Sequence, residues 1–415
     1  MNGQVGLEAW LERWMAGEAP SQAPDSVLEK VEKSVASSRQ RPVWLATVLV
    51  PAMRRRRSVA VGSPRVRAIA IVLAAGLLMA LVAGAGLVGA HVLLPDRATP
   101  AGINGLIGFD AGFDIFVANS DGSGRRALTA DARADTDPTW SPDGTRLAFW
   151  SRPGRVGPIF LVLVAPDGGG RSEIHAAGPI SFPETTGGHP NISWQPSGAK
   201  LAVLGSIAGR GVPVVIDPAT SGLKPLDVGG LDVFTLDWSP DGSLIAFVGD
   251  DARGRSIWVV RPDGSGLRQV RPPSTGDADY TSVSWSADSR RLAFTRLGAD
   301  LTHDLLVVDV VTGAETLVAT GGDYYWPSYS PDGAWIAFGS GPAALHVVRP
   351  DGSGSRTITT PPIGTEDIAW SPDGTRILVF AADLTGLDVV PLDGGAVVTI
   401  EARGNVGSPS WQRLP

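Results

Sequence analysis

One short pattern constrains this chain more than any other: an aromatic residue, a Ser-Pro-Asp-Gly turn and then an apolar strand. The copy at Trp370 reads Trp-Ser-Pro-Asp-Gly, and Ile377-Leu-Val follows it. Proline presets φ at the second turn position and glycine takes the left-handed exit, so each copy predicts a β-hairpin. The aromatic positions, 41–54 residues apart, are Trp140, Trp194, Trp238, Trp285, Tyr329, Trp370 and Trp411. A repeat of this length with four short strands is typical of a β-propeller blade.

A second pattern alternates with the first and supplies the outer half of each blade. It is an apolar strand followed by a Gly-containing turn, and it occurs seven times, from Ile115 to Gly394. Its first copy lacks an aromatic turn before it, and Trp411 has no copy after it. The two fragments predict a shared blade in which the Trp411 strand lies innermost, beside 106–109, 115–118 and 126–129. The expected fold is an all-β, seven-bladed β-propeller closed by its N- and C-terminal strands in one blade. Six blades with an unclosed remainder is the competing count.

The repeat resembles a known group of propellers. Trp-Ser-Pro-Asp-Gly followed by Leu-Ala-Phe, with Val-Val-Arg-Pro-Asp-Gly-Ser-Gly at 347–354, is similar to the repeat of the periplasmic protein TolB and of prolyl-oligopeptidase-type propellers. The resemblance covers residues 104–415 and implies a TolB-like, WD-repeat-like or PD40-like propeller. Propellers carry unrelated functions, so the resemblance predicts the fold and leaves the activity open.

Residues 67–93 are predicted to form a transmembrane helix. The 23 residues from Ala68 to Ala90 are uncharged and nearly all apolar, enough to cross a hydrocarbon core of about 30 Å. Arg54–Arg57, Arg65 and Arg67 precede this stretch, so the positive-inside rule places the N-terminus in the cytoplasm and the propeller outside. Residues 94–103 are expected to be a linker. Gly76, Ala80 and Gly84 share one helix face, which would permit a homodimer.

Residues 1–60 are expected to form a short cytoplasmic helical segment. Leu7, Trp10, Leu11, Trp14 and Met15 have the spacing of one apolar helix face. The segment is interpreted either as a poorly ordered tail or as a docking element for a cytoplasmic protein. The layout of helical segment, single span and outer sensor is similar to that of membrane-bound anti-sigma factors. The segment contains no His or Cys, so the zinc motif common in that family is missing.

Composition argues against several classes of function. The chain has no Cys, which excludes disulfides and Cys nucleophiles. Residues 1–95 carry a net charge of +5 and the rest −12, so the propeller is not expected to bind nucleic acid. No Gly-x-Ser-x-Gly elbow occurs, and His175, His189, His303 and His346 lack ligand-like spacing. The sequence therefore predicts no enzyme, no metal and no cofactor. The rival interpretation is a metal-dependent lyase or lactonase that uses the channel mouth, with a metal site assembled from different blades.

The residues just before each inner strand differ from blade to blade, and they form the candidate binding site. The loops that carry them should converge on one mouth of the central channel, where carboxylates and aromatic rings would favour a cation, a basic peptide or a sugar. The alternative is that they are solvated loop residues. The repeated tryptophans should instead pack between blades. The candidates are Arg133, Asp135, Asp137, His189, Asn191, Asp232, Asp277, Asp279, Tyr280, Asp323, Tyr324, Tyr325, Trp326, Glu366 and Asp367.

These observations predict a bacterial cell-envelope protein with one membrane span and a propeller outside the cytoplasm. The propeller is expected to act as a binding, sensing or scaffold module for a protein or peptide partner. The N-terminal helices are expected to relay to a cytoplasmic partner. An enzyme at the channel mouth and an anti-sigma-factor-like regulator are the alternatives.

Overall fold

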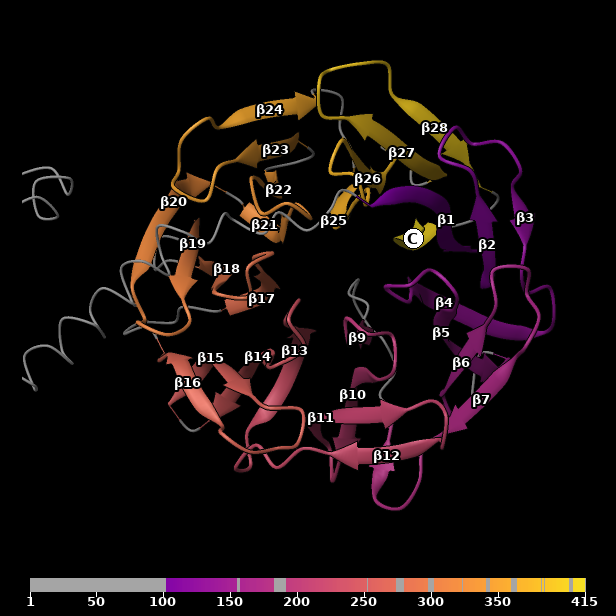
Figure 1. The fold of residues 1–415 in the computed structure, drawn as a ribbon, viewed down its shortest axis with the longest axis horizontal. Helices are drawn as coiled ribbons and strands as arrows, with labels where there is room; N and C mark the ends of the chain where they lie inside the picture. The colour runs from indigo at the N-terminus through magenta and orange to yellow at the C-terminus, as the bar shows by residue number, and fades with distance from the viewer. Residues whose placement is uncertain are drawn as a thin grey trace, which may run out of the picture. The chain divides into compact units, whose positions relative to one another are not determined.

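Seven antiparallel sheets follow one another around a ring in the computed structural model (Figure 1). The structure describes residues 102–414 apart from 155–156, 183–191, 252, 274–279, 298–301, 323, 341–343, 360–363, 382, 384 and 403–405. The backbone alone is described for residues 280, 281, 324, 325, 359 and 364–366. The predicted cytoplasmic segment, the predicted span and the Gly76/Ala80/Gly84 face lie outside the described residues.

The seven blades are numbered along the chain, and blade 1 contains both the first and the last strand. Its sheet has the order β29-β1-β2-β3, with β29 Val406–Leu414, β1 Ile103–Ala111, β2 Asp114–Ala118 and β3 Arg126–Ala127. Blade 2 consists of β4 Arg133–Trp140, β5 Leu147–Pro153, β6 Phe160–Val164 and β7 Ser172–His175. Blade 3 has five strands, β8 Ile180–Ser181, β9 Ile192–Trp194, β10 Leu201–Ile207, β11 Arg210–Asp217 and β12 Gly222–Pro225.

The other four blades have four strands each. Blade 4 consists of β13 Asp232–Trp238, β14 Ile245–Asp251, β15 Gly254–Val260 and β16 Arg268–Arg271. Blade 5 consists of β17 Tyr280–Trp285, β18 Arg291–Leu297, β19 His303–Asp309 and β20 Glu315–Gly322. Blade 6 consists of β21 Tyr324–Tyr329, β22 Ile336–Ser340, β23 Ala344–Val348 and β24 Arg356–Thr359. Blade 7 consists of β25 Gly364–Trp370, β26 Arg376–Phe380, β27 Gly386–Pro391 and β28 Val398–Glu401.

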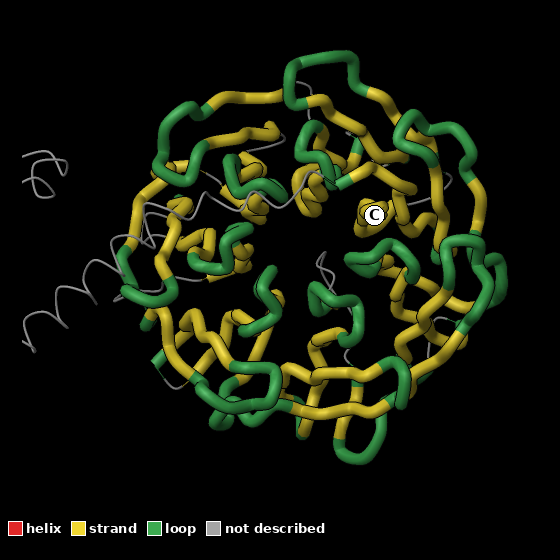
Figure 2. Tube along the Cα trace, viewed as in Figure 1, coloured by secondary structure: helices red, strands yellow, loops and turns green. Residues whose placement is uncertain are grey.

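The all-β, seven-bladed prediction is confirmed, including the closure in blade 1. The described part of the chain contains strands and loops and no helix, as Figure 2 shows. Accordingly, no helix within the described ranges has the length and apolar character needed to cross a membrane.

Each Ser-Pro-Asp-Gly turn is held by its own side chains. In the Ser371 turn, the Ser371 hydroxyl donates to Asp373 Oδ1 at 2.6 Å and accepts the Arg376 N–H at 2.9 Å. Asp373 Oδ1 also accepts the Thr375 N–H at 2.9 Å. These bonds are made between groups of the turn itself, as expected for an Asx-type turn. The aspartates of these turns are therefore structural.

The core consists of seven apolar clusters, each shared by two neighbouring blades. Trp194, for example, packs with Trp150 and Leu161 of blade 2 as well as with Leu201 of its own blade. Its indole Nε1–H also donates to the Thr139 carbonyl of blade 2 at 3.1 Å. Burial of so much apolar surface is the main stabilising contribution, and it joins the blades in a ring. The structure thus confirms the prediction that the repeated tryptophans pack between blades.

Candidate functional site

The residue that precedes each repeated aromatic lies on an inner strand, and Ser193, Asp237, Ser284 and Ser328 line a cavity in the central channel. Four of the side chains at this position accept the backbone N–H of the aromatic in the next blade. Ser193 Oγ accepts from Trp238 at 2.9 Å, Ser284 Oγ from Tyr329 at 3.1 Å, Ser410 Oγ from Trp140 at 3.0 Å and Asp237 Oδ2 from Trp285 at 3.4 Å. The side chains therefore point across the blade boundaries along the channel wall.

Asp237 differs from the other residues at this position, because Thr139, Ser193, Ser284, Ser328, Ala369 and Ser410 carry no charge. Ser193 Oγ donates to Asp237 Oδ1 at 3.1 Å. Burial raises the pKa of Asp237 to about 6, although hydrogen bonds from Ser193 and Trp285 partly offset this effect. A carboxyl with this pKa changes its charge near neutral pH.

A cavity of about 220 Å³ lies in the channel, between the inner strands of six blades. Its wall is rich in hydroxyl groups, and the carboxylates of Asp237 and Asp367 are its acidic members. Ser282 Oγ is buried there without a hydrogen-bond partner among the described residues. The polar lining consists of Ser193, Thr235, Asp237, Ser282, Ser284, Ser328 and Asp367. Such a wall suits a small cationic group that donates hydrogen bonds.

Three carboxyl groups meet beside the channel where the ring closes. We call Asp110, Asp137, Asp367 and Ser408 the closure cluster; all four are buried. Ser408 Oγ lies 2.8 Å from Asp137 Oδ1 and 3.0 Å from Asp367 Oδ2. A hydroxyl has one proton, so Ser408 either donates to one of these two carboxyl groups or shares its proton between them.

Burial changes the acidity of Asp110 in the closure cluster. Its Oδ1 accepts the Asp137 N–H at 3.2 Å. Burial, and then the negative charge of Asp137, raise the pKa of Asp110 to about 8. Gly407 faces it on β29, and a Cβ at that position would lie 2.4 Å from Asp110 Oδ2. The glycine thus leaves the space that the carboxyl group occupies.

Irregular backbone shapes the mouth of the channel. The register shifts between Thr136 and Thr139 in β4 and between Tyr325 and Ser328 in β21. Asp137 and Trp326 lie in these shifts with φ of 57° and 53°, a conformation that non-glycine residues seldom adopt. A bulge redirects side chains locally and often lies beside a functional site.

The structure brings together some of the sequence-predicted residues and separates others. Asp137 and Asp367 meet through Ser408, and Trp326 lines the same cavity as Asp367. Arg133 instead pairs with Glu173 of the outer strand β7. Asp232 Oδ1 accepts the Gly211 N–H at 2.7 Å.

Asp135 is fully buried, and burial raises its pKa. His189, Asn191, Asp277, Asp279 and Asp323 lie outside the described residues, as do the side chains of Tyr280, Tyr324, Tyr325 and Glu366. Within the ranges that the structure describes, no group of three or more His, Cys, Asp or Glu side chains could hold a metal ion.

Sequence reasoning missed Asp110, Asp237 and Ser408. A signal for Asp237 exists, because a small polar residue recurs just before most of the repeated aromatics and Asp237 replaces it with a carboxylate. Asp110 and Ser408 lie at opposite ends of the propeller sequence. Only the closure of the ring brings them together.

Comparison with known proteins agrees with this architecture. Residues 258–412 match the family described as the lipoprotein LpqB beta-propeller domain. An uncharacterized protein of Agrobacterium fabrum is 28% identical over 240 residues, which cover 53% of this chain and 79% of that protein.

Two solved structures are similar to this chain over about three quarters of its length. Oligogalacturonate lyase from Vibrio parahaemolyticus is similar with a TM-score of 0.52 and 13% identity, over 73% of this chain and 91% of that one. TolB from Acinetobacter baumannii has a TM-score of 0.48 and 18% identity, over 74% of this chain and 66% of that one, slightly less than two thirds. The chain is thus a seven-bladed β-propeller, similar over residues 258–412 to the propeller domain of lipoprotein LpqB.

Proposed function

We propose that this protein is a binding or scaffold module of the cell envelope, with its propeller outside the cytoplasm. In this proposal residues 67–93 span the membrane, 94–103 form a linker, 104–415 form the propeller and 1–60 remain in the cytoplasm. The Arg-flanked apolar stretch 68–90 supports the anchor. The match of residues 258–412 to a lipoprotein propeller domain supports an envelope location.

The channel cavity is the observation that carries the binding role. Its volume of about 220 Å³ is below the range of roughly 300–1,000 Å³ that is usual for small-molecule sites. A single inserted side chain would fill such a cavity. Because Asp237 and Asp367 line it, a Lys or Arg side chain of a protein partner is the occupant that its charge favours.

Site-specific photo-cross-linking in cells tests this role. A photo-reactive amino acid at Thr235, in the cavity wall, is compared with one at Val311, an exposed position outside it. The proposal expects a cross-linked protein at Thr235 that is absent at Val311 and is reduced severalfold by Asp237→Asn. Identical products at both positions, or products that Asp237→Asn leaves unchanged, would reject a channel partner.

Metal analysis of the purified protein separates this proposal from the rival metal-dependent lyase or lactonase. A stoichiometric bound cation that is lost when His189 and Asp137 are replaced by Ala would favour the enzyme.

A further part of the proposal is that two copies pair within the membrane through the face formed by Gly76, Ala80 and Gly84. Small residues at this spacing let two helices approach closely, and a large side chain would keep them apart. Gly76→Leu should therefore abolish dimer cross-links in cells. Cross-links that persist in this variant would reject pairing through this face.

The last part of the proposal concerns residues 1–60. They would relay the binding state of the propeller to a cytoplasmic partner, as an anti-sigma-factor-like regulator would. Deleting 1–60 should then remove that partner in a pull-down while the Thr235 cross-link persists. A partner that is retained after the deletion would reject the relay.

A further inference from the structure

A groove of about 680 Å³ lies between blades 6, 7 and 1, away from the channel cavity. Arg356 of β24 and Arg376 of β26 supply its cationic groups, and Val389, Leu392 and Val398 supply apolar surface. We call it the Arg356 groove. Its volume falls within the range of roughly 300–1,000 Å³ that is typical of small-molecule sites.

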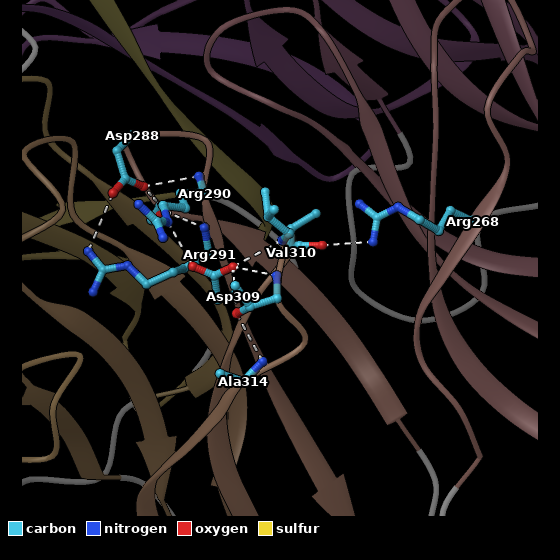
Figure 3. Close-up of polar contacts among 10 residues, drawn as sticks. Arg268, Asp288, Arg290, Arg291, Asp309, Val310 and Ala314 are labelled. Atoms are coloured by element: carbon cyan, nitrogen blue, oxygen red, sulfur yellow. Dashed lines mark hydrogen bonds and ion pairs between the residues drawn. The ribbon is translucent and has the colours of Figure 1, made fainter. Parts of the chain in front are cut away.

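A side chain bridges the corresponding junction between blades 4 and 5 (Figure 3). There, Arg268 Nη1 donates to the Val310 carbonyl of the next blade at 2.7 Å. Arg290 Nε pairs with Asp309 Oδ2 at 2.7 Å beside it. The first contact ties the outer strand of blade 4 to blade 5, and the second is an ion pair within blade 5.

Strand register identifies the matching residues at the two junctions. Arg268 lies opposite Val259 in blade 4, as Arg356 lies opposite Val347 in blade 6. The Val310 N–H donates to the Arg290 carbonyl at 2.9 Å, and the Leu392 N–H donates to the Thr375 carbonyl at the same distance. Leu392 and Thr375 in blade 7 therefore correspond to Val310 and Arg290 in blade 5.

The basic residue at the Arg268 position reaches the next blade in other junctions as well. Arg126 of blade 1 donates to the Pro166 carbonyl of blade 2. Lys224 of blade 3 donates to the Asp263 carbonyl of blade 4 at 2.8 Å. Together with Arg268, these residues show that the usual role of a cation at this position is to join two blades.

Arg356 departs from this role. Its guanidinium lies over the Trp335 ring, 5.3 Å from the centroid, and Arg349 lies over the same ring at 5.0 Å. Among the described residues Arg356 has no carboxylate or carbonyl partner. Thr375 and Pro391 stand where the other junction has the Arg290–Asp309 pair, so this junction lacks that ion pair too. The Arg356 groove thus lies at a junction from which both contacts are missing.

Arg376 provides a second guanidinium, and one of its N–H donors has a described partner. Its Nη1 donates to Ser120 Oγ at 3.3 Å, and within the described ranges it has no carboxylate partner. Asp121 and Asp393 also line the groove, but their Oδ1 atoms accept N–H groups of their own turns, from Ser123 at 2.9 Å and Gly395 at 3.0 Å. Their charges make the groove unfavourable for a polyanion.

We propose that the Arg356 groove binds a small organic monocarboxylate with an apolar body. Guanidinium groups match a carboxylate in geometry and form two parallel hydrogen bonds with it. The side chains of Val389, Leu392 and Val398 provide the surface that an aliphatic or aromatic body would cover. A single carboxylate can face Arg356 and Arg376, whereas a second negative group would meet Asp121 and Asp393.

Ligand-observed NMR titration of the full chain with 4-phenylbutyrate tests the site. The neutral 4-phenylbutyramide and inorganic sulfate serve as control probes. Arg356→Gln is compared with Arg268→Gln, which removes the matching guanidinium from the junction of blades 4 and 5. Thermal melts establish that each variant is folded. The expected result is saturable binding of 4-phenylbutyrate, weakened about tenfold or more by Arg356→Gln and unchanged by Arg268→Gln.

Three results would overturn the inference. They are equal binding of the amide and the acid, equal loss in the two arginine variants, and no saturable binding at millimolar 4-phenylbutyrate. None of these results bears on the channel partner, which the Thr235 cross-link tests separately.

Discussion

Trp411 of the last strand lies directly opposite Ile107 of the first described strand, in the antiparallel pair β29–β1. Both side chains are buried in the apolar cluster that joins blades 7 and 1. The two ends of the propeller sequence are therefore fastened by a sheet register and by shared core. No other blade depends on residues so far apart in the sequence.

Trp411→Ala should open the ring at this point. Truncating a buried Trp to Ala typically costs about 3–5 kcal/mol, because it removes apolar contacts and leaves a cavity. Urea unfolding of the propeller should show a loss of this order. Leu414→Ala, in the same strand but partly exposed, is the control and should cost much less. Equal effects of the two variants would contradict a closure that depends on Trp411.

Asp110→Asn should change how stability depends on pH. The pKa of Asp110 is about 8 in the folded protein and 3.8 in a free side chain, so folding favours its protonated form. The resulting stability is fully present below about pH 4 and is lost as the pH rises to about 8. Asn mimics the protonated carboxyl. The variant should therefore lose less stability than the wild type between about pH 5 and pH 9, measured by denaturant unfolding.

Asp110→Asn could alter stability through packing alone, and that change would be the same at every pH. Parallel pH curves for the variant and the wild type would thus argue against a protonated Asp110. Asp393→Asn, at an exposed turn carboxylate, is a suitable control for the loss of one negative charge.

Asp237→Asn should remove the pH dependence of partner binding at the channel. The pKa of Asp237 is about 6, so its charge develops as the pH rises through that value. A basic side chain in the cavity should bind more tightly at about pH 7.5 than at about pH 5, and the Thr235 cross-link yield should rise accordingly. The variant should give a lower yield with a flatter pH profile. A wild-type yield that falls with rising pH would contradict a cationic occupant.

Ser371→Ala should destabilise the protein by about 1–2 kcal/mol, because it removes two hydrogen bonds of a buried hydroxyl. Ser353→Ala, in an exposed turn, is the matched control and should have little effect. Thermal unfolding monitored by circular dichroism measures both. A negligible effect of Ser371→Ala would show that proline and glycine alone hold the turn.

Much of the fold could be predicted from local sequence. The Ser-Pro-Asp-Gly turns and the flanking apolar strands are local signals, and the missing halves at the two ends of the repeat region predicted the closure. Trp411 is the clearest case. Its strand was an unmatched part of the repeat, and so was the segment that begins near 106, so the two were predicted to share a blade.

The candidate site could be predicted only in part, because its residues are far apart in the sequence and only the fold brings them together. Asp110 and Asp367 are far apart in the sequence, and the contact of Ser408 with Asp137 requires the ring to close. The register shifts at Asp137 and Trp326 redirect side chains in a way that strand periodicity does not predict. Arg356 has the same local sequence pattern as Arg268, and only the contacts of the next blade distinguish them.

The most direct test of the proposed function is the side of the membrane on which the propeller lies. Because the chain has no Cys, single cysteines can be introduced by Pro20→Cys and Ser265→Cys and treated with a membrane-impermeant thiol reagent in intact cells. We predict labelling at 265 in intact cells and at 20 only after permeabilisation. Labelling at 20 and not at 265 in intact cells would contradict it.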